Sequence, residues 1–154
     1  MTIIAWHREL GIAVDSQCSS GESCNTTITK YRIVDGVFYA GAGKAEMVER
    51  IFDCIEADAQ ISFDIEGAQV VAFKFATATT PVEVRRVATG SKRFGDTVPV
   101  PSAMWEAIGS GCTFAIAALT HGKNPAQAVA MACKYDPACG GKVNYFDIRG
   151  EEVC

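Results

Sequence analysis

The chain has 154 residues, of which 49% are apolar and 21% are charged, and its formal net charge is −4. These values fit one globular domain over residues 1–154 and provide no basic field for nucleic acid or anionic lipid. No apolar run approaches the roughly 20 residues of a membrane helix, and MTIIAWHREL lacks the features of a signal peptide. We therefore expect a cytoplasmic protein with no membrane partner and no nucleic-acid partner.

The first part of the chain is expected to form strands and then one helix. β-Branched and aromatic residues mark the strands, and Asp35-Gly36 is a strong signal for a two-residue hairpin. The helix is marked by an apolar stripe of Met47, Ile51, Cys54 and Ile55. The expected order is strands at 2–6 and 11–17, a polar loop at 18–27, strands at 28–34 and 37–43, and a helix at 44–59.

The second part returns to strands before two more helices. Gly122 is placed to end one helix, while Asn124 and Pro125 form a well-marked start for the next. The expected order is strands at 68–76 and 82–88, a further strand within 97–111, helices from Cys112 to Thr120 and from Pro125 to Asp136, and a strand at 142–148. Helices that are grouped rather than alternating with strands predict an α+β fold of stacked antiparallel sheets covered by helices.

The cysteines do not form a metal or disulfide pattern. Their odd number and the lack of a CxxC pair favour reduced thiols packed as small hydrophobic groups. Only His7 and His121 are available as imidazole ligands, so we expect no structural metal. The seven are Cys18, Cys24, Cys54, Cys112, Cys133, Cys139 and Cys154.

Thr2 is the first candidate for chemistry. Methionine aminopeptidase removes Met1 when the second residue is small, which would leave a hydroxyl and a free α-amine on Thr2. An α-amine has a pKa of about 7.7–8.0, so a useful fraction is neutral near pH 7 and can accept the hydroxyl proton. A threonine at position two is ordinary by itself, so the surrounding sequence has to support this interpretation.

The surrounding motifs resemble the proteasome β-subunits and the bacterial HslV-type peptidases, which are N-terminal nucleophile (Ntn) hydrolases. The resemblance rests on the order and spacing of TIIAW, GIAVDSQ, TKYRIVDGVFYAGAG, AIGSGCTFAIAALTHG and YDPACGG, over roughly two-thirds of the chain. It implies an αββα-type Ntn-hydrolase sandwich and a threonine-type peptidase with Thr2 as nucleophile. It implies no cofactor.

The resemblance also implies a charged pair beside the nucleophile. Lys30 falls on the family's active-site lysine, and Asp15 falls on the acidic residue that pairs with it. A fixed ammonium near Thr2 would lower the pKa of its hydroxyl and amine. The alternative for such a pair is a surface ion pair that contributes under about 1 kcal/mol.

Further positions carry over from the same motifs. Gly41 matches the residue whose backbone N–H forms the oxyanion hole. The segment GAGK could also suggest a phosphate-binding loop, but it lacks an earlier Gly at the required spacing and the required Ser/Thr. Ser110 matches the serine that hydrogen-bonds the threonine amine, and Asp136 matches the acidic residue beside it. Cys139 stands where relatives usually have a second serine, and a thiol is the poorer hydrogen-bond partner. Cys112 also replaces a common serine.

The residues of the first specificity pocket are inferred only from their nearness to pocket positions in relatives. Cys18, Ile28 and Tyr39 fall near positions that line it in relatives, which would favour apolar side chains before the cleaved bond. Strand alternation could equally place Tyr39 in the core.

One departure from the family concerns the helices. Relatives carry two long helices between the Gly-rich strand and the next strands, whereas here only residues 44–59 are long enough and the second helix is expected to be missing or reduced. We therefore expect a homo-oligomer without assuming a standard ring. A separate ATPase unfoldase would be needed to supply unfolded protein as substrate.

Two other functions remain open at this stage. The first is a catalytically inactive proteasome-like scaffold or binding subunit, which Cys139 and the reduced helical layer favour. The second is a small-molecule amidase, because one fold can host several amide-cleaving chemistries.

Overall fold

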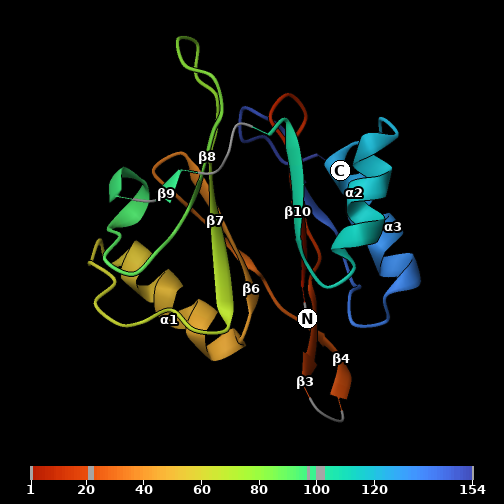
Figure 1. Ribbon diagram of the computed structural model, residues 1–154, viewed down its shortest axis with the longest axis horizontal. Helices are drawn as coiled ribbons and strands as arrows, with labels where there is room; N and C mark the ends of the chain where they lie inside the picture. The colour runs from red at the N-terminus through yellow and green to blue at the C-terminus, as the bar shows by residue number, and fades with distance from the viewer. Residues whose placement is uncertain (1, 21–22, 97, 100–102, 154) are drawn as a thin grey trace. The chain divides into compact units, whose positions relative to one another are not determined.

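The computed structural model describes residues 2–20, 23–96, 98–99 and 103–153, with side chains for all of these except 18–20, 23–27, 95–96 and 98–99. The chain forms two compact units (Figure 1). Unit 1 comprises Met1–Lys30 and Ala103–Cys154, and unit 2 comprises Tyr31–Ser102. The single domain expected over residues 1–154 stays a prediction.

Unit 1 is built on a four-stranded antiparallel sheet in the order β10-β1-β2-β11. Its central strand β1 has Ile3, Ile4, Ala5 and Trp6 fully buried, so neither face of β1 is open to solvent. The bounds are β1 Ile3–His7, β2 Gly11–Val14, β10 Trp105–Gly109 and β11 Asn144–Phe146.

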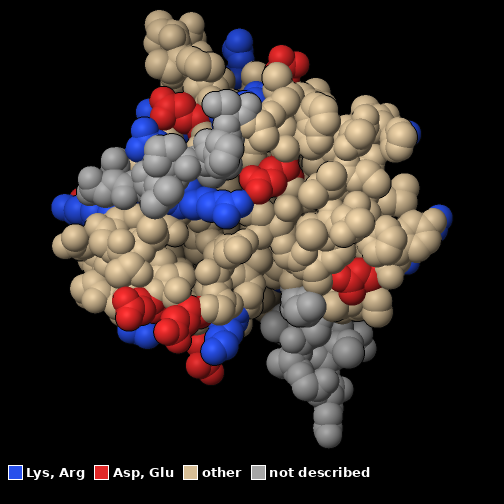
Figure 2. All heavy atoms as spheres, viewed as in Figure 1, with Lys and Arg blue, Asp and Glu red and all other residues tan. Residues whose placement is uncertain are grey.

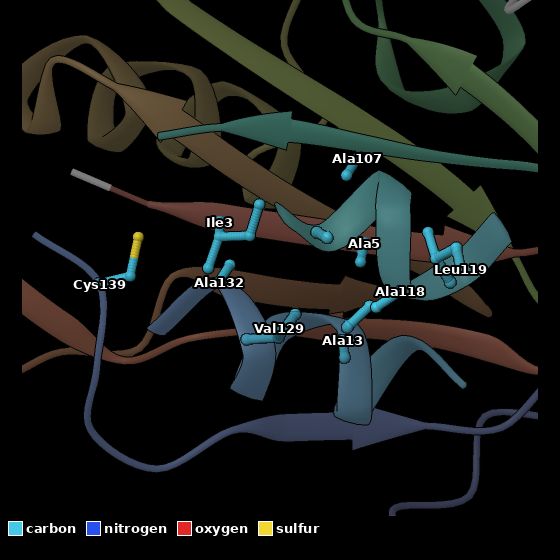
Figure 3. Close-up of a cluster of buried hydrophobic side chains, with 11 residues drawn as sticks. Ile3, Ala5, Ala13, Ala107, Ala118, Leu119, Val129, Ala132 and Cys139 are labelled. Atoms are coloured by element: carbon cyan, nitrogen blue, oxygen red, sulfur yellow. The ribbon is translucent and has the colours of Figure 1, made fainter. Parts of the chain in front are cut away.

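Helices α2 (Cys112–Thr120) and α3 (Pro125–Tyr135) pack on one face of this sheet. Figure 3 shows Ile3 and Ala5 of β1 and Ala13 of β2 directed toward the helices. Much of the cluster is alanine, and small side chains allow helix and sheet backbones to approach closely. The buried members are Ile3, Ala5, Ala13, Ala107, Ala115, Ala118, Leu119, Ala128, Val129, Ala132 and Cys139.

The predicted ends of these helices are confirmed. Asn124 caps α3 through a bond from the Gln127 N–H at 2.8 Å, and the Gln127 side chain accepts the Asn124 N–H at 3.0 Å. Pro125 occupies the first turn, where a missing N–H costs no helical bond. Gly122 follows the cap of α2 with a φ of 83°, a conformation that favours glycine.

The prediction of a polar loop at 18–27 is wrong. Strands β3 (Gln17–Ser20) and β4 (Ser23–Thr27) pair antiparallel, with Gln17 opposite Thr27. Strand pairing uses backbone groups, so Ser, Thr and Asn residues can form a ladder without the apolar alternation that sequence patterns detect.

Unit 2 is a five-stranded antiparallel sheet in the order β5-β6-β7-β8-β9. The predicted hairpin is confirmed, because Asp35 and Gly36 both have positive φ, 50° and 74°, between β5 and β6. The strand expected from Ile28 begins at Tyr31. The bounds are β5 Tyr31–Val34, β6 Val37–Gly43, β7 Ala68–Lys74, β8 Glu83–Arg86 and β9 Val98–Pro99, with a 3-10 turn at Arg93–Asp96.

Helix α1 (Ala45–Glu56) packs on this sheet. Val48, Ile51, Phe52 and Ile55 are its buried residues, while Met47 and Cys54 of the predicted stripe are half-buried. Residues 57–67, between α1 and β7, form turns and irregular structure. Near α1, acidic and basic side chains lie together (Figure 2), and Arg32 pairs with both Glu49 and Glu56.

Each unit is therefore an antiparallel sheet with helices, as the predicted α+β class requires. The αββα arrangement needs two such sheets, and the structure is compatible with it. No helix in the described part of the chain is long and apolar enough to cross a membrane.

The packing of α1 on β6 gives the first testable prediction. A Cβ added at Gly41 would lie 2.3 Å from Val48 Cγ1. Gly41→Ala should therefore lower the free energy of unfolding by about 1–3 kcal/mol through overpacking. Urea unfolding followed by circular dichroism measures this. In the background of Val48→Ala the penalty of Gly41→Ala should shrink, and equal penalties in both backgrounds would contradict the packing.

Candidate active site

A buried carboxylate, Asp15, organises the candidate site in unit 1. Asp15 follows β2, and its side chain is fully buried. One oxygen, Oδ1, accepts the Ile3 backbone N–H at 3.1 Å and the Lys30 ammonium at 2.9 Å. The other oxygen, Oδ2, accepts the N–H of Gly140 at 3.1 Å. Three donors thus satisfy a charge that burial would otherwise make very costly.

Lys30 and the backbone of Ile3, directly after Thr2, bind the same carboxylate of Asp15. Lys30 is only 4% exposed, so the Lys30–Asp15 contact is a buried ion pair and the surface-pair alternative is wrong. The Asp15 oxygen that binds Lys30 also binds Ile3, the residue directly after Thr2. Thr2 itself is 7% exposed. The arrangement brings an ammonium to the backbone next to the predicted nucleophile.

Gly109 allows β10, which ends just before Ser110, to contact the backbone of Thr2. In β1–β10 pairing, Ile3 lies opposite Gly109. Gly109 has a φ of 107°, and a Cβ there would collide with the backbone carbonyl of Thr2. Only glycine permits this approach. Ser110 therefore follows a backbone position in direct contact with Thr2.

Ser110, Asp136 and Cys139 form one hydrogen-bonded group. Ser110 Oγ lies 3.1 Å from Cys139 Sγ. That sulfur can donate to the Ser110 carbonyl at 3.5 Å or to Asp136 Oδ2 at 3.6 Å. The structure thus brings together the three side chains that the motifs predicted, with a thiol in place of the expected second hydroxyl.

The environment of this group perturbs two pKa values. The Ala138 N–H donates to Asp136 Oδ1 at 2.9 Å and lowers the pKa of Asp136, despite the opposing effect of partial burial. The Ser110 hydroxyl and the Cys139 thiol add to this lowering of the Asp136 pKa. The neighbouring Cys133 and Ser110 side chains lower the pKa of the Cys139 thiol, against the opposing effect of burial. Asp136 therefore stays ionised as an acceptor at neutral pH.

The contacts that hold the turn at 137–141 were not predicted from the sequence. Gln17 donates through Nε2 to the Pro137 carbonyl at 3.1 Å, and its backbone N–H binds the Gly140 carbonyl at 3.0 Å. A Cβ at Gly140 would lie 2.1 Å from Gln17 Oε1. The Gly-Gly dipeptide was the available signal, because adjacent glycines often mark a close backbone approach.

The remaining predicted site residues are less directly supported. Ile28 is half-buried in unit 1, and its N–H binds the Ser16 carbonyl at 2.8 Å. Cys18 lies in β3, and its side chain is outside the described part, as is Met1, whose removal we expect. Cys112 is half-buried at the start of α2. The pocket-lining roles of Cys18 and Ile28 stay predictions.

Two predicted residues belong to unit 2. Gly41 lies in β6 one residue beyond Ala40, where the register with β5 ends. Tyr39 is 1% exposed within the core cluster of that unit, and burial raises its pKa to about 12. This placement supports the core alternative for Tyr39 over a role in a pocket wall. The oxyanion role of Gly41 stays a prediction.

No group of three or more His, Cys, Asp or Glu side chains could hold a metal ion within the described ranges.

Comparisons with known proteins bear on the fold. No protein-family model and no curated protein sequence matches the chain. The solved structure of Thiobacillus denitrificans BPH in complex with epoxomicin is similar, with a TM-score of 0.68 at 14% sequence identity. The match covers 98% of this chain and 100% of that one. It supports a proteasome-type fold and does not single out an HslV-type member.

The buried Lys30–Asp15 pair predicts that substitutions of the two residues have strongly coupled effects on the free energy of unfolding. Asp15→Asn removes the carboxylate charge and should lower the free energy of unfolding by about 3–5 kcal/mol, because the Lys30 ammonium loses its buried counter-charge. Adding Lys30→Met should recover part of that loss in urea unfolding. Glu56→Gln, in the exposed pair with Arg32, should cost under about 1 kcal/mol. Additive losses from Asp15→Asn and Lys30→Met would contradict the pair.

Asp136 predicts a pH dependence. Its folded pKa lies below its unfolded value, so its contribution to stability is present above the unfolded pKa of about 3.9. That contribution is lost as pH falls through the folded pKa. Urea midpoints measured from neutral pH downward should therefore fall more steeply below about pH 4 in the wild type than in Asp136→Asn. Parallel curves for the two proteins would contradict the lowered pKa.

Proposed function

We propose that the protein is an N-terminal threonine hydrolase that cleaves peptide bonds after loss of Met1. The observation that carries the proposal is the shared Asp15 oxygen, which binds both the Lys30 ammonium and the N–H of Ile3. A buried ammonium held beside residue 2 has a clear use if residue 2 is a nucleophile. The similar fold of a protein solved with epoxomicin, a threonine protease inhibitor, supports the same class.

The chemistry follows from groups on the chain itself. The freed α-amine of Thr2 takes the hydroxyl proton as Oγ1 attacks the substrate carbonyl carbon. The tetrahedral intermediate collapses, the peptide nitrogen takes that proton from the amine and leaves, and an ester on Thr2 remains. A water then attacks that ester and gives up a proton to the amine. The amine returns this proton to Oγ1 as the C–O bond to Thr2 breaks and the acid product leaves. The Lys30 charge lowers the pKa values of the hydroxyl and the amine throughout.

Ser110, Asp136 and Cys139 have a supporting role in this proposal. Ser110 follows the glycine that contacts the Thr2 carbonyl, so its hydroxyl is a candidate partner for the amine of Thr2. Asp136, with its lowered pKa, and Cys139 orient that hydroxyl. These three are positioning residues, whereas Thr2 is the proposed catalytic residue.

Peptide or unfolded protein is the proposed substrate, as the family resemblance implies. Cys18 and Ile28 remain candidates for an apolar first pocket. A homo-oligomer and a separate ATPase unfoldase also remain proposals, and sedimentation of the purified chain tests the first of them directly.

One observation favours a second candidate, a catalytically silent scaffold. Cys139 replaces a hydroxyl in the group that would support the Thr2 amine, and sulfur is a weak hydrogen-bond partner. The buried Lys30–Asp15 pair speaks against a scaffold. A buried ion pair often adds little net stability, so a protein that served only as a scaffold would have no physical need for one.

Substitution of the nucleophile tests the proposal. Thr2→Ala should reduce hydrolysis of a fluorogenic peptide panel by a factor on the order of 10³ or more, because no other group supplies both hydroxyl and amine. Thr2→Ser keeps both groups and should retain part of the rate. Thr120→Ala, at an exposed position of α2, should leave the rate unchanged.

Two outcomes would contradict the proposal. One is retention of Met1 in protein purified from its native host, as read from the intact mass. The other is hydrolysis that survives Thr2→Ala. Turnover of simple amides without turnover of peptides would instead indicate an amidase on the same nucleophile.

A further inference from the structure

Gln17 binds a turn that lies far from it in the sequence. It is the first residue of β3 and comes two residues after the buried carboxylate of Asp15. Its side chain reaches the turn at 137–141, where Nε2 donates to the Pro137 carbonyl at 3.1 Å. Its backbone N–H donates to the Gly140 carbonyl of the same turn at 3.0 Å. One residue therefore holds this turn near both of its ends.

The turn at 137–141 carries part of the group around Ser110. Asp136 directly precedes the turn, and Cys139 lies in its middle with 3% of its surface exposed. Figure 3 shows Cys139 on this turn, at the edge of the buried cluster of unit 1. Cys139 Sγ lies 3.1 Å from Ser110 Oγ. A shift of the turn would therefore move the thiol away from the hydroxyl that it contacts.

The two ends of the turn are bound in different ways. At the Gly140 end, the Asp15 carboxylate accepts the Gly140 N–H at 3.1 Å. The backbone N–H groups of Ser16 and Gln17 donate to the Gly140 carbonyl at 3.1 Å and 3.0 Å. At the Pro137 end, the bond comes from the side-chain amide of Gln17. A substitution that changes only this side chain therefore releases the Pro137 end and keeps the bonds at Gly140.

The chemistry of the contact requires a hydrogen-bond donor at position 17. Pro137 has no N–H and offers only its carbonyl, which accepts. The Gln17 amide supplies the donor, whereas an ionised glutamate of the same length would only accept. The amide also packs closely on the turn, because a Cβ at Gly140 would collide with Gln17 Oε1. Both the length and the donor of the glutamine are therefore used.

We propose that Gln17 is a positioning residue that fixes the turn at 137–141 beside Ser110. It acts through Cys139, which contacts the Ser110 hydroxyl, and not on the scissile bond itself. The consequence for activity rests on the proposed function, in which Ser110 supports the Thr2 amine. The fixing of the turn does not rest on that function and is measured separately.

Alkylation of Cys139 reports the position of the turn independently of activity. The reduced full-length protein is treated with iodoacetamide under native conditions, and trypsin should then release residues 135–142, whose single cysteine is Cys139. Gln17→Met, of similar length but without a donor, should raise the alkylation rate of Cys139 by about 3-fold to 10-fold, because a lost hydrogen bond shifts a local opening equilibrium by about that factor. Gln17→Lys keeps a donor and should stay within about twofold of the wild type.

Gln60 provides a matched control in unit 2. Its Nε2 also donates to a backbone carbonyl, that of Gly90, at 3.1 Å. Gln60→Met loses the same kind of bond at the same distance and should leave the alkylation rate of Cys139 unchanged. Equal rates in the wild type and Gln17→Met would overturn the inference, and so would equal increases in Gln17→Met and Gln60→Met.

Two further measurements decide the question if Gln17→Met does not fold. Gln17→Glu is a second variant without a donor, and it should also react faster than Gln17→Lys; equal rates in these two variants would overturn the inference. In the wild type, Cys139 should react more slowly than the half-buried Cys112, which trypsin should release in residues 94–123 as their single cysteine. A wild-type Cys139 as reactive as Cys112 would contradict a fixed turn.

Peptide hydrolysis provides the second readout. Gln17→Met should lower kcat by about 10-fold to 100-fold and leave KM within about twofold, because a displacement of about 1 Å in a supporting group can have that effect on the rate. Gln17→Lys should recover most of kcat, and Gln60→Met should not change it. A Gln17→Met protein with faster alkylation and an unchanged kcat would overturn the positioning role. A wild type that starts at Thr2 and never hydrolyses a peptide would contradict the proposed function and leave the fixing of the turn standing.

Discussion

The carboxylate of Asp15 is the contact on which the candidate site depends. A fully buried charge is stable only when its partners are complete, and Asp15 receives one ammonium and two backbone N–H groups. Those donors come from the start of β1, from Lys30 before β5 and from the turn after α3. One side chain therefore connects the strand of the proposed nucleophile, the proposed electrostatic activator and the Cys139 turn. Loss of its charge would disturb all three together.

Close backbone contacts at two glycines hold the other parts of the candidate site in place. Gly109 lets β10 meet the Thr2 carbonyl, and Gly140 lets the turn after α3 meet Gln17. The alanine-rich face of the sheet lets α2 and α3 approach closely, so Ser110 and Asp136 are held by the packed core of unit 1. Rigid supports of this kind suit a hydroxyl and an amine that must be aligned before reaction.

Local sequence signals were enough for much of the fold. The Asn124-Pro125 start of α3, the Asp35-Gly36 hairpin and the helix from Ala45 each rest on interactions within a few residues. The β3–β4 hairpin was not predictable in this way, because its polar residues carry no apolar alternation. In the site, motif order brought Thr2, Asp15 and Lys30 together. The bond from Gly140 to Asp15 links residues distant in sequence, and no local pattern encodes it.

The central claim is that Thr2 acts with both its hydroxyl and its freed amine. An epoxyketone peptide such as epoxomicin offers a ketone to the hydroxyl and an epoxide to the amine, so it reports both groups in one product. The most direct measurement is mass spectrometry of the N-terminal peptide after incubation with epoxomicin. We expect a peptide that begins at Thr2 and carries one inhibitor, with no adduct on Thr2→Ala. An unmodified Thr2 in a chain that has lost Met1 would contradict it.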